Sequence, residues 1–567
     1  MGSIYHCQYW QEFIVLLSHA LRGVIKEGYN AASLRKDIVS GITVGVVAIP
    51  LGMALAIAIG VPPQHGLYTV IVAGFLVALF GGSRFNITGP TAAFVVILLP
   101  IVQQYGFGGL MLATMMSGVI LIIMGMLKLG RVISFVPYPV TIGFTAGIGF
   151  VIAFLQLKDL LGLQLASSPL HFFDKVQVYG SALPTLNPLD AIVGIITILT
   201  FIGWSKFTSK VPAHIVALTV ATLLAVAMTG SGLGATSTLG SQFHFTLDGV
   251  VGNGIPQQLP SFSFPVISMD LIYQLLPASL AIAMLGAIES LLCAVVADGM
   301  TKTRHDSNGE LVAQGMGNIV APLFGGIPAT AAIARTATNI RAGGLTPVAG
   351  MVHAIFVLLA MLILAPVLSY IPMAGLAGIL VMVAWNMSEA PHFIKLVKVA
   401  PKRDVAVLLT CFTLTVVFDM VVAVGVGMTL ACLLFIQRSM DITSSSSEVI
   451  NRDEMAKNAL VYHRLEGPLF FAANDKIKSL AQQTPINSQV VVIDFEQVTA
   501  IDISAIKALE ELIEELSNMR ILITHVKPHL FTKLLKVGVN NIANVEICES
   551  DSQFDDHLFS LGQKNSV

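Results

Sequence analysis

The chain has 567 residues, and charged residues make up 11% of it, against roughly 25% in soluble proteins. Hydrophobic residues make up 55%, which is more than one aqueous core can bury, so the composition excludes an ordinary soluble enzyme and indicates a polytopic membrane protein. The net charge of −2 provides no basic stripe for nucleic acid. The five cysteines are scattered without metal-ligand spacing, so we expect neither a bound metal nor a disulfide framework.

Charge is unevenly distributed along the chain. Charged residues are sparse between 38 and 438 and much denser after 438, so the two regions are expected to face different solvents. The first residues repeat apolar side chains at helical spacing without a cleavage site, which favours a helix lying on the membrane. The predicted organisation is a cytoplasmic N-terminal region with this amphipathic helix at 1–36, a transmembrane domain at 37–438, a linker at 439–450 and a soluble domain at 451–567.

From Asp37 onward, apolar spans alternate with short breaks, and we count up to fourteen of them, some too short or too interrupted by Gly and Pro to be simple spanning helices. Basic residues gather at alternate breaks, and the long connector from Thr229 to Asp270 contains no Lys or Arg. Because basic loops stay in the cytoplasm, we expect both termini to be cytoplasmic and this connector to be translocated.

The two halves of the transmembrane region echo each other. The tetrapeptide Leu-Phe-Gly-Gly occurs at 79–82 and again at 323–326, and each copy is followed by Thr-Ala-Ala, at 91–93 and at 330–332. With seven spans in each half, the odd number inverts the second copy in the membrane. Inverted repeats are typical of secondary transporters.

Two ionisable residues stand out in apolar surroundings. Glu289 is the only acidic residue that we place deep within a span, where a carboxyl is protonated, paired or bound to a cation. Arg335 follows a Gly-Pro break at 325–328, and the matching break at 89–91 suits the start of a second half-helix. Two half-helix N-termini and an arginine predict an anion site. The alternatives are a Glu289 that only locks two helices and an Arg335 that reaches water.

The soluble tail alternates two kinds of pattern. Strand-like runs at 460–465, 490–495 and 521–526 are separated by helix-like runs such as 503–516, which predicts a small α/β domain. The serine run at 444–447 is typical of a polar linker. We find no nucleophile elbow, phosphate-binding loop or zinc motif in the whole chain, so no enzymatic chemistry is predicted.

At these residues the sequence resembles the sulfate-permease (SulP) family of anion transporters, over roughly residues 30 to 550. The resemblance implies a polytopic α-helical protein with 14 transmembrane segments in a 7+7 inverted repeat and a C-terminal cytoplasmic α/β STAS domain. It also implies a core subdomain, spans 1 to 4 and 8 to 11, that moves against a gate subdomain of spans 5 to 7 and 12 to 14. The segments that carry the resemblance are Ser83–Ala93, Glu289–Leu292, Ala334–Thr336 and Phe418–Asp419.

The family binds its anion between spans 1, 3, 8 and 10. Many relatives have Gln in place of Leu51 and an aromatic residue in place of Leu55. Sodium-coupled relatives use an Asp and a Thr in span 8 where this chain has Glu289 and Cys293, so the resemblance favours proton coupling through Glu289 over sodium coupling. The implied substrate site comprises Leu51, Leu55, Thr91, Ala92, Glu289, Ala334, Arg335 and Thr336.

In the tail, Asp502 and Ser504 match the STAS loop of the family. The residue between them is Ile503, where phosphorylatable relatives have Ser, so simple phosphorylation at this position is not expected. A soluble partner such as acyl carrier protein is implied for this domain.

Three further segments, 283–301, 317–326 and 383–390, resemble the bacterial C4-dicarboxylate transporters of the family. We therefore expect a homodimer in the bacterial inner membrane that takes up succinate, fumarate, malate or aspartate with protons by elevator-like alternating access. The alternatives are a bicarbonate or sulfate transporter of the same family, and an anion-gated channel or sensor that signals through the STAS domain.

Overall fold

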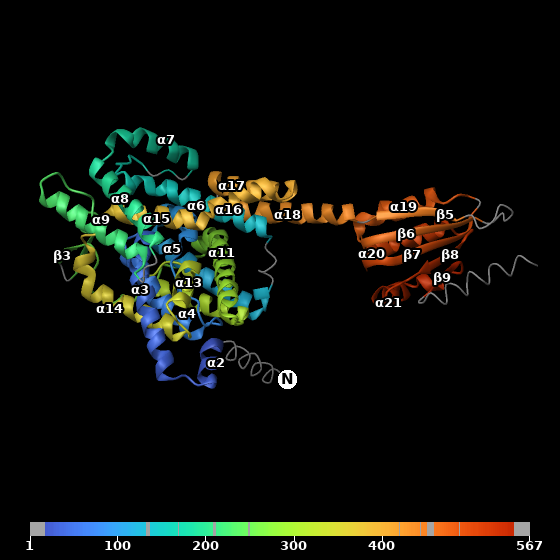
Figure 1. Cartoon of the computed structure of the whole chain (residues 1–567), viewed down its shortest axis with the longest axis horizontal. Helices are drawn as coiled ribbons and strands as arrows, with labels where there is room; N and C mark the ends of the chain where they lie inside the picture. Colours follow the sequence, from blue (N-terminus) through green and yellow to red (C-terminus); the bar gives the residue numbers. More distant parts are fainter. Residues whose placement is uncertain are drawn as a thin grey trace, which may run out of the picture. The chain divides into compact units, whose positions relative to one another are not determined.

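The computed structural model describes residues 18–131, 137–167, 169, 171–207, 211–247, 250–418, 420–442, 444–450, 459–486 and 488–548. The chain divides into two compact units, Met1–Thr429 and Leu430–Val567 (Figure 1). The first unit is almost entirely helical and the second contains a five-stranded sheet.

The first half of the membrane unit supplies seven spans, because Gly106, with φ 67°, divides α5 into two. Helix α2 (His19–Glu27) precedes them, and α7 (Phe172–Ala182) lies between α6 and α8. The spans are α3 (Ala31–Ala58), α4 (Gln64–Phe80), the 3₁₀ helix η1 (Ala92–Phe94) with α5 (Val95–Met126), α6 (Tyr138–Leu160), α8 (Pro188–Lys206) and α9 (Ala213–Gly230).

The second half also supplies seven spans, and α16 (Ala390–Val399) joins two of them. A short helix, α10 (Leu239–Gln242), and a hairpin of β2 (His244–Leu247) and β3 (Val250–Asn253) lie in the connector between the halves. The spans are α11 (Met269–Thr301), α12 (Ser307–Leu323), α13 (Ile333–Arg341), α14 (Val348–Leu368), α15 (Met373–Ser388), α17 (Lys402–Val417) and α18 (Met420–Ile442).

The predicted fourteen spans are therefore confirmed, although only eight helical segments of the described chain are long and apolar enough to cross a membrane alone. Of the other spans, α4, α12, α13 and α17 have 17 residues or fewer. Helix α13, for example, has nine residues, and three of them, Arg335, Thr336 and Asn339, are buried polar side chains.

The inverted repeat is confirmed by a crossing in the middle of the unit. Strand β1 (Thr88–Gly89) follows α4, strand β4 (Thr330–Ala331) follows α12, and the two strands pair antiparallel. The Leu-Phe-Gly-Gly copies end α4 and α12, as expected of equivalent segments. The Thr-Ala-Ala copies are not equivalent: the first leads into η1, whereas the second begins inside β4. Such short runs of small residues recur by chance in apolar sequence, so the Thr-Ala-Ala match is not part of the internal repeat.

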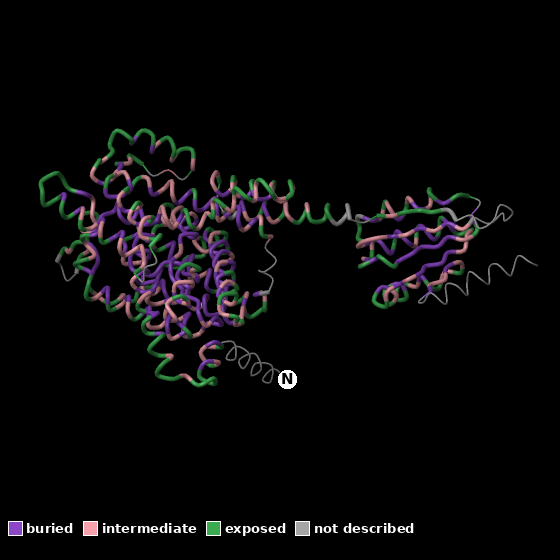
Figure 2. The backbone as a smooth tube through the Cα atoms, in the orientation of Figure 1, coloured by how far each residue is buried: buried purple, intermediate pink, exposed green. Residues whose placement is uncertain are grey.

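The spans form two groups, as the resemblance implied. Helices α3, α4, α5, α11, α12, α13 and α14 pack together, and α6, α8, α9, α15 and α17 form the second group. Buried backbone concentrates where the first group meets (Figure 2). Glycines allow a close contact between α5 and α12: a Cβ on Gly118 would lie 2.6 Å from the Gly315 carbonyl oxygen. We call the two groups the core and the gate.

The tail unit is the predicted α/β domain. Its strands β5 to β9 lie in sequence order, with β5 antiparallel to β6 and the remaining neighbours parallel. Buried side chains of the central strands pack against those of the three helices in one apolar core. The elements are β5 (Ser444–Ile450), β6 (Ala459–Leu469), α19 (Asn474–Gln483), β7 (Ser488–Ile501), α20 (Ile503–Glu515), β8 (Arg520–Thr524), α21 (Pro528–Val537) and β9 (Val545–Ile547).

Two predicted boundaries need correction. The serine run at 444–447, expected in a linker at 439–450, is the start of β5, and α18 continues to Ile442. Because β5 is the edge strand of the sheet, polar side chains suit it as well as they suit a linker. At the N-terminus, most of the predicted amphipathic helix lies outside the described residues. Its last part is α2, and α3 starts at Ala31, six residues before the predicted boundary.

Candidate anion-binding site

The site is built on two half-helices that begin at the strand crossing. Thr91 precedes η1 and Ala332 precedes α13, and neither residue donates or accepts a side-chain hydrogen bond that caps its helix. The first N–H groups of both helices are therefore left for a ligand. A helix N-terminus also carries a partial positive charge, so the crossing favours an anion.

Arg335, in the first turn of α13, is the cation at the crossing. Its side chain is 3% exposed, and Nη2 donates a hydrogen bond of 2.6 Å to the Pro90 carbonyl oxygen of the other repeat. Nη1 has no hydrogen-bond partner among the described residues. Gly89 makes this position possible, because a Cβ there would lie 2.5 Å from Nη1. Arg335 therefore links the two half-helices while one side of its guanidinium stays available.

Glu289 faces the same crossing from α11. Its Oε2 accepts a hydrogen bond of 2.9 Å from the Thr91 hydroxyl. No ion pair within 4.0 Å joins it to Arg335 or to any other described residue. Among the described residues Glu289 is therefore paired by one hydrogen bond, which joins α11 to the residue that precedes η1, and by no salt bridge. Its carboxylate is partly buried and is held by a single hydroxyl.

The other predicted residues lie in the expected spans with different surroundings. Leu51 and Leu55 are buried on α3, which packs against α13. Ala92 is buried in η1 and Ala334 is exposed in the first turn of α13. All four side chains are apolar.

The hydroxyl of Thr336 joins α13 to two other segments of the core. Its Oγ1 accepts hydrogen bonds from the Ile87 N–H at 3.0 Å and from the Cys293 thiol at 3.2 Å. Thr336 therefore holds the chain leading into β1 against α13. Cys293 is directed at this hydroxyl, on the same helix as Glu289.

In the tail, Asp502 is the N-cap of α20. Its two carboxylate oxygens accept hydrogen bonds from the Ala505 N–H at 2.8 Å and the Phe471 N–H at 2.9 Å. Ser504 is partly buried, whereas the neighbouring Ile503 is 70% exposed. The loop therefore presents an apolar side chain at its surface, at the position where the sequence led us to expect no simple phosphorylation.

Glu310 is the residue that the sequence analysis missed, and Glu289 is not the only deep acidic group. Glu310 is buried in α12, and its four acceptor positions are filled. Oε2 accepts from the Gly82 and Ser83 N–H groups, both at 3.1 Å, and Oε1 accepts from the amides of Asn86 at 2.8 Å and Gln314 at 3.2 Å. It lies in the first turn of α12, after Ser307, Asn308 and Gly309, so the local sequence does not distinguish it from an exposed residue at a helix end.

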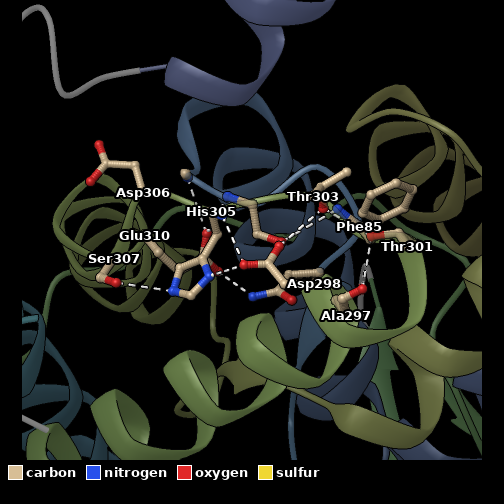
Figure 3. Close-up of polar contacts among 12 residues, drawn as sticks. Phe85, Ala297, Asp298, Thr301, Thr303, His305, Asp306, Ser307 and Glu310 are labelled. Atoms are coloured by element: carbon tan, nitrogen blue, oxygen red, sulfur yellow. Dashed lines mark hydrogen bonds and ion pairs between the residues drawn. The ribbon is translucent and has the colours of Figure 1, made fainter. Parts of the chain in front are cut away.

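A polar cluster next to Glu310 ties α11 to α12. The His305 ring lies between Asp298, with Nδ1 at 2.8 Å from Oδ2, and Ser307, with Nε2 at 3.0 Å from Oγ (Figure 3). These are the groups of a hydrolytic triad, but Ser307 packs against Gly130, where an added Cβ would lie 2.8 Å from the Ser307 Cβ. The cluster therefore has a structural role: it fixes the loop that leads into α12, the helix that carries Glu310.

Residues 34–411 match the profile of the sulfate permease family, and residues 453–551 match that of the STAS domain. The chain belongs to the sulfate permease family. It is therefore a multi-pass membrane protein of an anion-transporter family that carries a C-terminal STAS domain.

The chain is 42% identical over 483 residues to the putative sulfate transporter YvdB of Bacillus subtilis, covering 84% of this chain and 88% of that protein. It is 31% identical over 512 residues to the bicarbonate transporter BicA of Picosynechococcus sp., covering 85% and 87%. Neither of these two relatives is named a C4-dicarboxylate transporter. The resemblance to the C4-dicarboxylate transporters of the family therefore stays a prediction.

Solved structures agree on the fold. The transmembrane domain of a cyanobacterial BicA superposes with a TM-score of 0.60 at 29% identity, covering 71% of this chain and 98% of that chain. The structure of SLC26A9 superposes with a TM-score of 0.82 at 17% identity, covering 98% and 95%. At 17% identity the second likeness concerns the fold alone.

Replacing Arg335 with Ala is expected to weaken anion binding by about a hundredfold or more, because losing one partner of a buried charged contact costs roughly 2–5 kcal/mol. Calorimetric titration of the purified protein with bicarbonate, sulfate and succinate measures this. Arg341→Ala is the matched control, since Arg341 is exposed in the last turn of the same helix. Wild-type affinity in R335A would exclude Arg335 from the site.

Replacing Glu310 with Gln is expected to destabilise the core by about 2–4 kcal/mol, because an amide leaves buried N–H donors without an acceptor. Glu289→Gln is the control: it changes a single hydrogen bond, so the expected loss is about 1 kcal/mol or less. Thermal unfolding in detergent, followed by tryptophan fluorescence, compares the two variants. If E310Q and E289Q unfold at the same temperature, the donors around Glu310 do not hold the core together.

Proposed function

We propose that this protein is a proton-coupled secondary transporter of a small oxyanion. The observation that carries the proposal is the buried Arg335, with Nη1 lacking a partner among the described residues, at two half-helix starts without side-chain caps. Such a guanidinium is costly in apolar surroundings unless an anion faces it. Bound oxyanions accept hydrogen bonds from guanidinium and backbone N–H groups alike.

The two packing groups suit alternating access. The half-helices, Arg335 and Glu289 all belong to the core, whereas α6, α8, α9, α15 and α17 form the gate. Movement of the core against the gate would carry the whole site with its ligand from one side of the membrane to the other. This elevator-like motion is part of the proposal.

Glu289 is the better proton carrier of the two deep carboxylates. Glu310 accepts four N–H hydrogen bonds, so a proton could enter only after one of them breaks. Glu289 accepts one, from Thr91, and can be protonated without disturbing the backbone. Sodium is less favoured, because the thiol of Cys293 stands where a hard cation would need an oxygen ligand.

Bicarbonate and sulfate are the substrates that we favour. Relatives that match most of the chain are named for them, and Arg335 is the one cation that the described residues place at the crossing. A C4-dicarboxylate is the second candidate, because the apolar side chains of Leu51 and Leu55 would suit its methylene carbons. Radiolabelled uptake into proteoliposomes, with a panel of competing anions, ranks these substrates.

A channel or sensor is the rival class. A carrier concentrates its anion against a gradient, whereas a channel only dissipates one, so concentrative uptake separates the two. A homodimer, and a soluble partner of the STAS domain such as acyl carrier protein, also belong to this proposal. Crosslinking in membranes and affinity capture on the purified tail test them.

Glu289→Gln is expected to abolish accumulation driven by a pH gradient while anion exchange continues, because the amide imitates a permanently protonated carboxyl. Proteoliposomes with an imposed pH gradient measure accumulation, and preloaded vesicles measure exchange. Asp298→Asn on the same helix is the control, since Asp298 lies at the α11–α12 loop. Accumulation that persists in E289Q would assign the coupling to another group.

Removal of residues 444–567 is expected to leave anion affinity within about twofold of the full chain, because every residue of the proposed site lies upstream and a tail can act only through contacts that differ between states. Turnover is expected to fall. Titration calorimetry and uptake on the same truncated preparation separate these effects. A folded truncation that binds no anion would contradict the assignment of the site to the core.

A further inference from the structure

Helix α16, which joins two spans of the gate, buries none of its ten residues. It starts at a sharp turn, where Glu389 has φ 43° and α15 ends. Two contacts attach it to the gate: the Tyr138 hydroxyl lies 2.7 Å from Nε2 of His392, and the rings of Phe393 and Phe412 are 5.3 Å apart. The helix is therefore fixed in place while most of its surface stays open.

The open surface is amphipathic. Phe393 and Val397 are half-buried on one side of the helical wheel, and Lys395 and Lys398 lie on the open side between the exposed Ile394 and Val399. Ile394 remains 52% exposed although it is apolar. A helix whose open surface presents basic side chains between exposed apolar ones suits the boundary between lipid tails and headgroups.

Three lysines line this boundary without acidic partners. Lys395, Lys398 and Lys402, the first residue of α17, form no ion pair within 4.0 Å with a described residue. Two exposed aromatic residues flank them: Trp385 near the end of α15 is 57% exposed and Tyr138 at the start of α6 is 55% exposed. Trp and Tyr side chains of this kind mark the interface of a membrane protein.

We propose that α16 is an interfacial helix whose Lys395, Lys398 and Lys402 bind the phosphate groups of anionic phospholipids. The helix connects the ends of two spans, so it lies at the level where headgroups begin. Lysine stems can lie along the acyl region while their ammonium groups reach the phosphates. Headgroups held by all three lysines would fix the gate in its leaflet, and the core would move against it.

Tryptophan quenching tests this proposal, because the chain has three tryptophans, and the substitutions W10F and W204F leave Trp385 as the reporter next to α16. The protein is reconstituted in phosphatidylcholine with a minor fraction of brominated phosphatidylglycerol, or of brominated phosphatidylcholine for comparison. We expect the anionic quencher to be at least about twice as effective, since each lysine near the surface attracts anionic lipid.

The preference for the anionic quencher is expected to disappear in the variant K395Q/K398Q/K402Q. It is also expected to fall as salt is raised with the lysines in place, because salt screens the attraction; this second measurement stands if the triple variant folds poorly. The matched control keeps Trp204, at the end of α8, with W10F and W385F. Its quenching should not respond to the three lysine substitutions.

Equal quenching of Trp385 by the two brominated lipids would overturn the proposal. So would a preference that survives both the triple substitution and high salt, because it would then come from apolar contacts or from another protein surface. An equal loss at Trp204 and Trp385 would also contradict it, since a general change in lipid packing would explain that result.

Discussion

The pairing of β1 with β4 is the contact on which the membrane unit depends. Two chains cross in the interior as short extended segments, where each backbone N–H and C=O needs a partner. The pairing of Thr88 with Ala331 and of Gly89 with Thr330 supplies partners from the opposite repeat, and the Ala332 N–H extends it to the Ile87 carbonyl. Because the strands satisfy each other, two helices can begin in the middle of the unit with their N-termini uncapped.

The buried carboxylates of the core differ in how many hydrogen-bond donors surround them. Asp37 accepts hydrogen bonds from the Leu345 N–H at 2.7 Å and from both the N–H and the hydroxyl of Thr346, and so holds the start of α14 against α3. Glu310 holds the loop after α4 with four donors. Glu289 has one. The first two fix the architecture of the core, and only Glu289 is free of backbone donors.

The sequence predicted features that depend on composition and isolated charge. The spans and the α/β tail were predicted from the runs of apolar residues and their spacing. Glu289 and Arg335 were singled out because an ionisable residue in an apolar run has few explanations. Glu310 was missed because three of its four donors lie more than 200 positions away in the chain. The serine run of β5 was misassigned because the solvent-facing edge of a sheet and a linker share a polar composition. Tertiary contacts, which no local pattern records, decided both cases.

The charges at the crossing connect the proposed coupling to the substrate. With Glu289 ionised, its charge would balance that of Arg335, so these two residues together would add no net charge at the empty crossing. A monovalent anion alone would add an unbalanced charge, at a cost that a proton on Glu289 removes. In the proposed mechanism the loaded crossing would then be neutral only if anion and proton moved together. A divalent anion would still leave one negative charge, so a site that accepted both bicarbonate and sulfate would move them with different dependence on membrane potential.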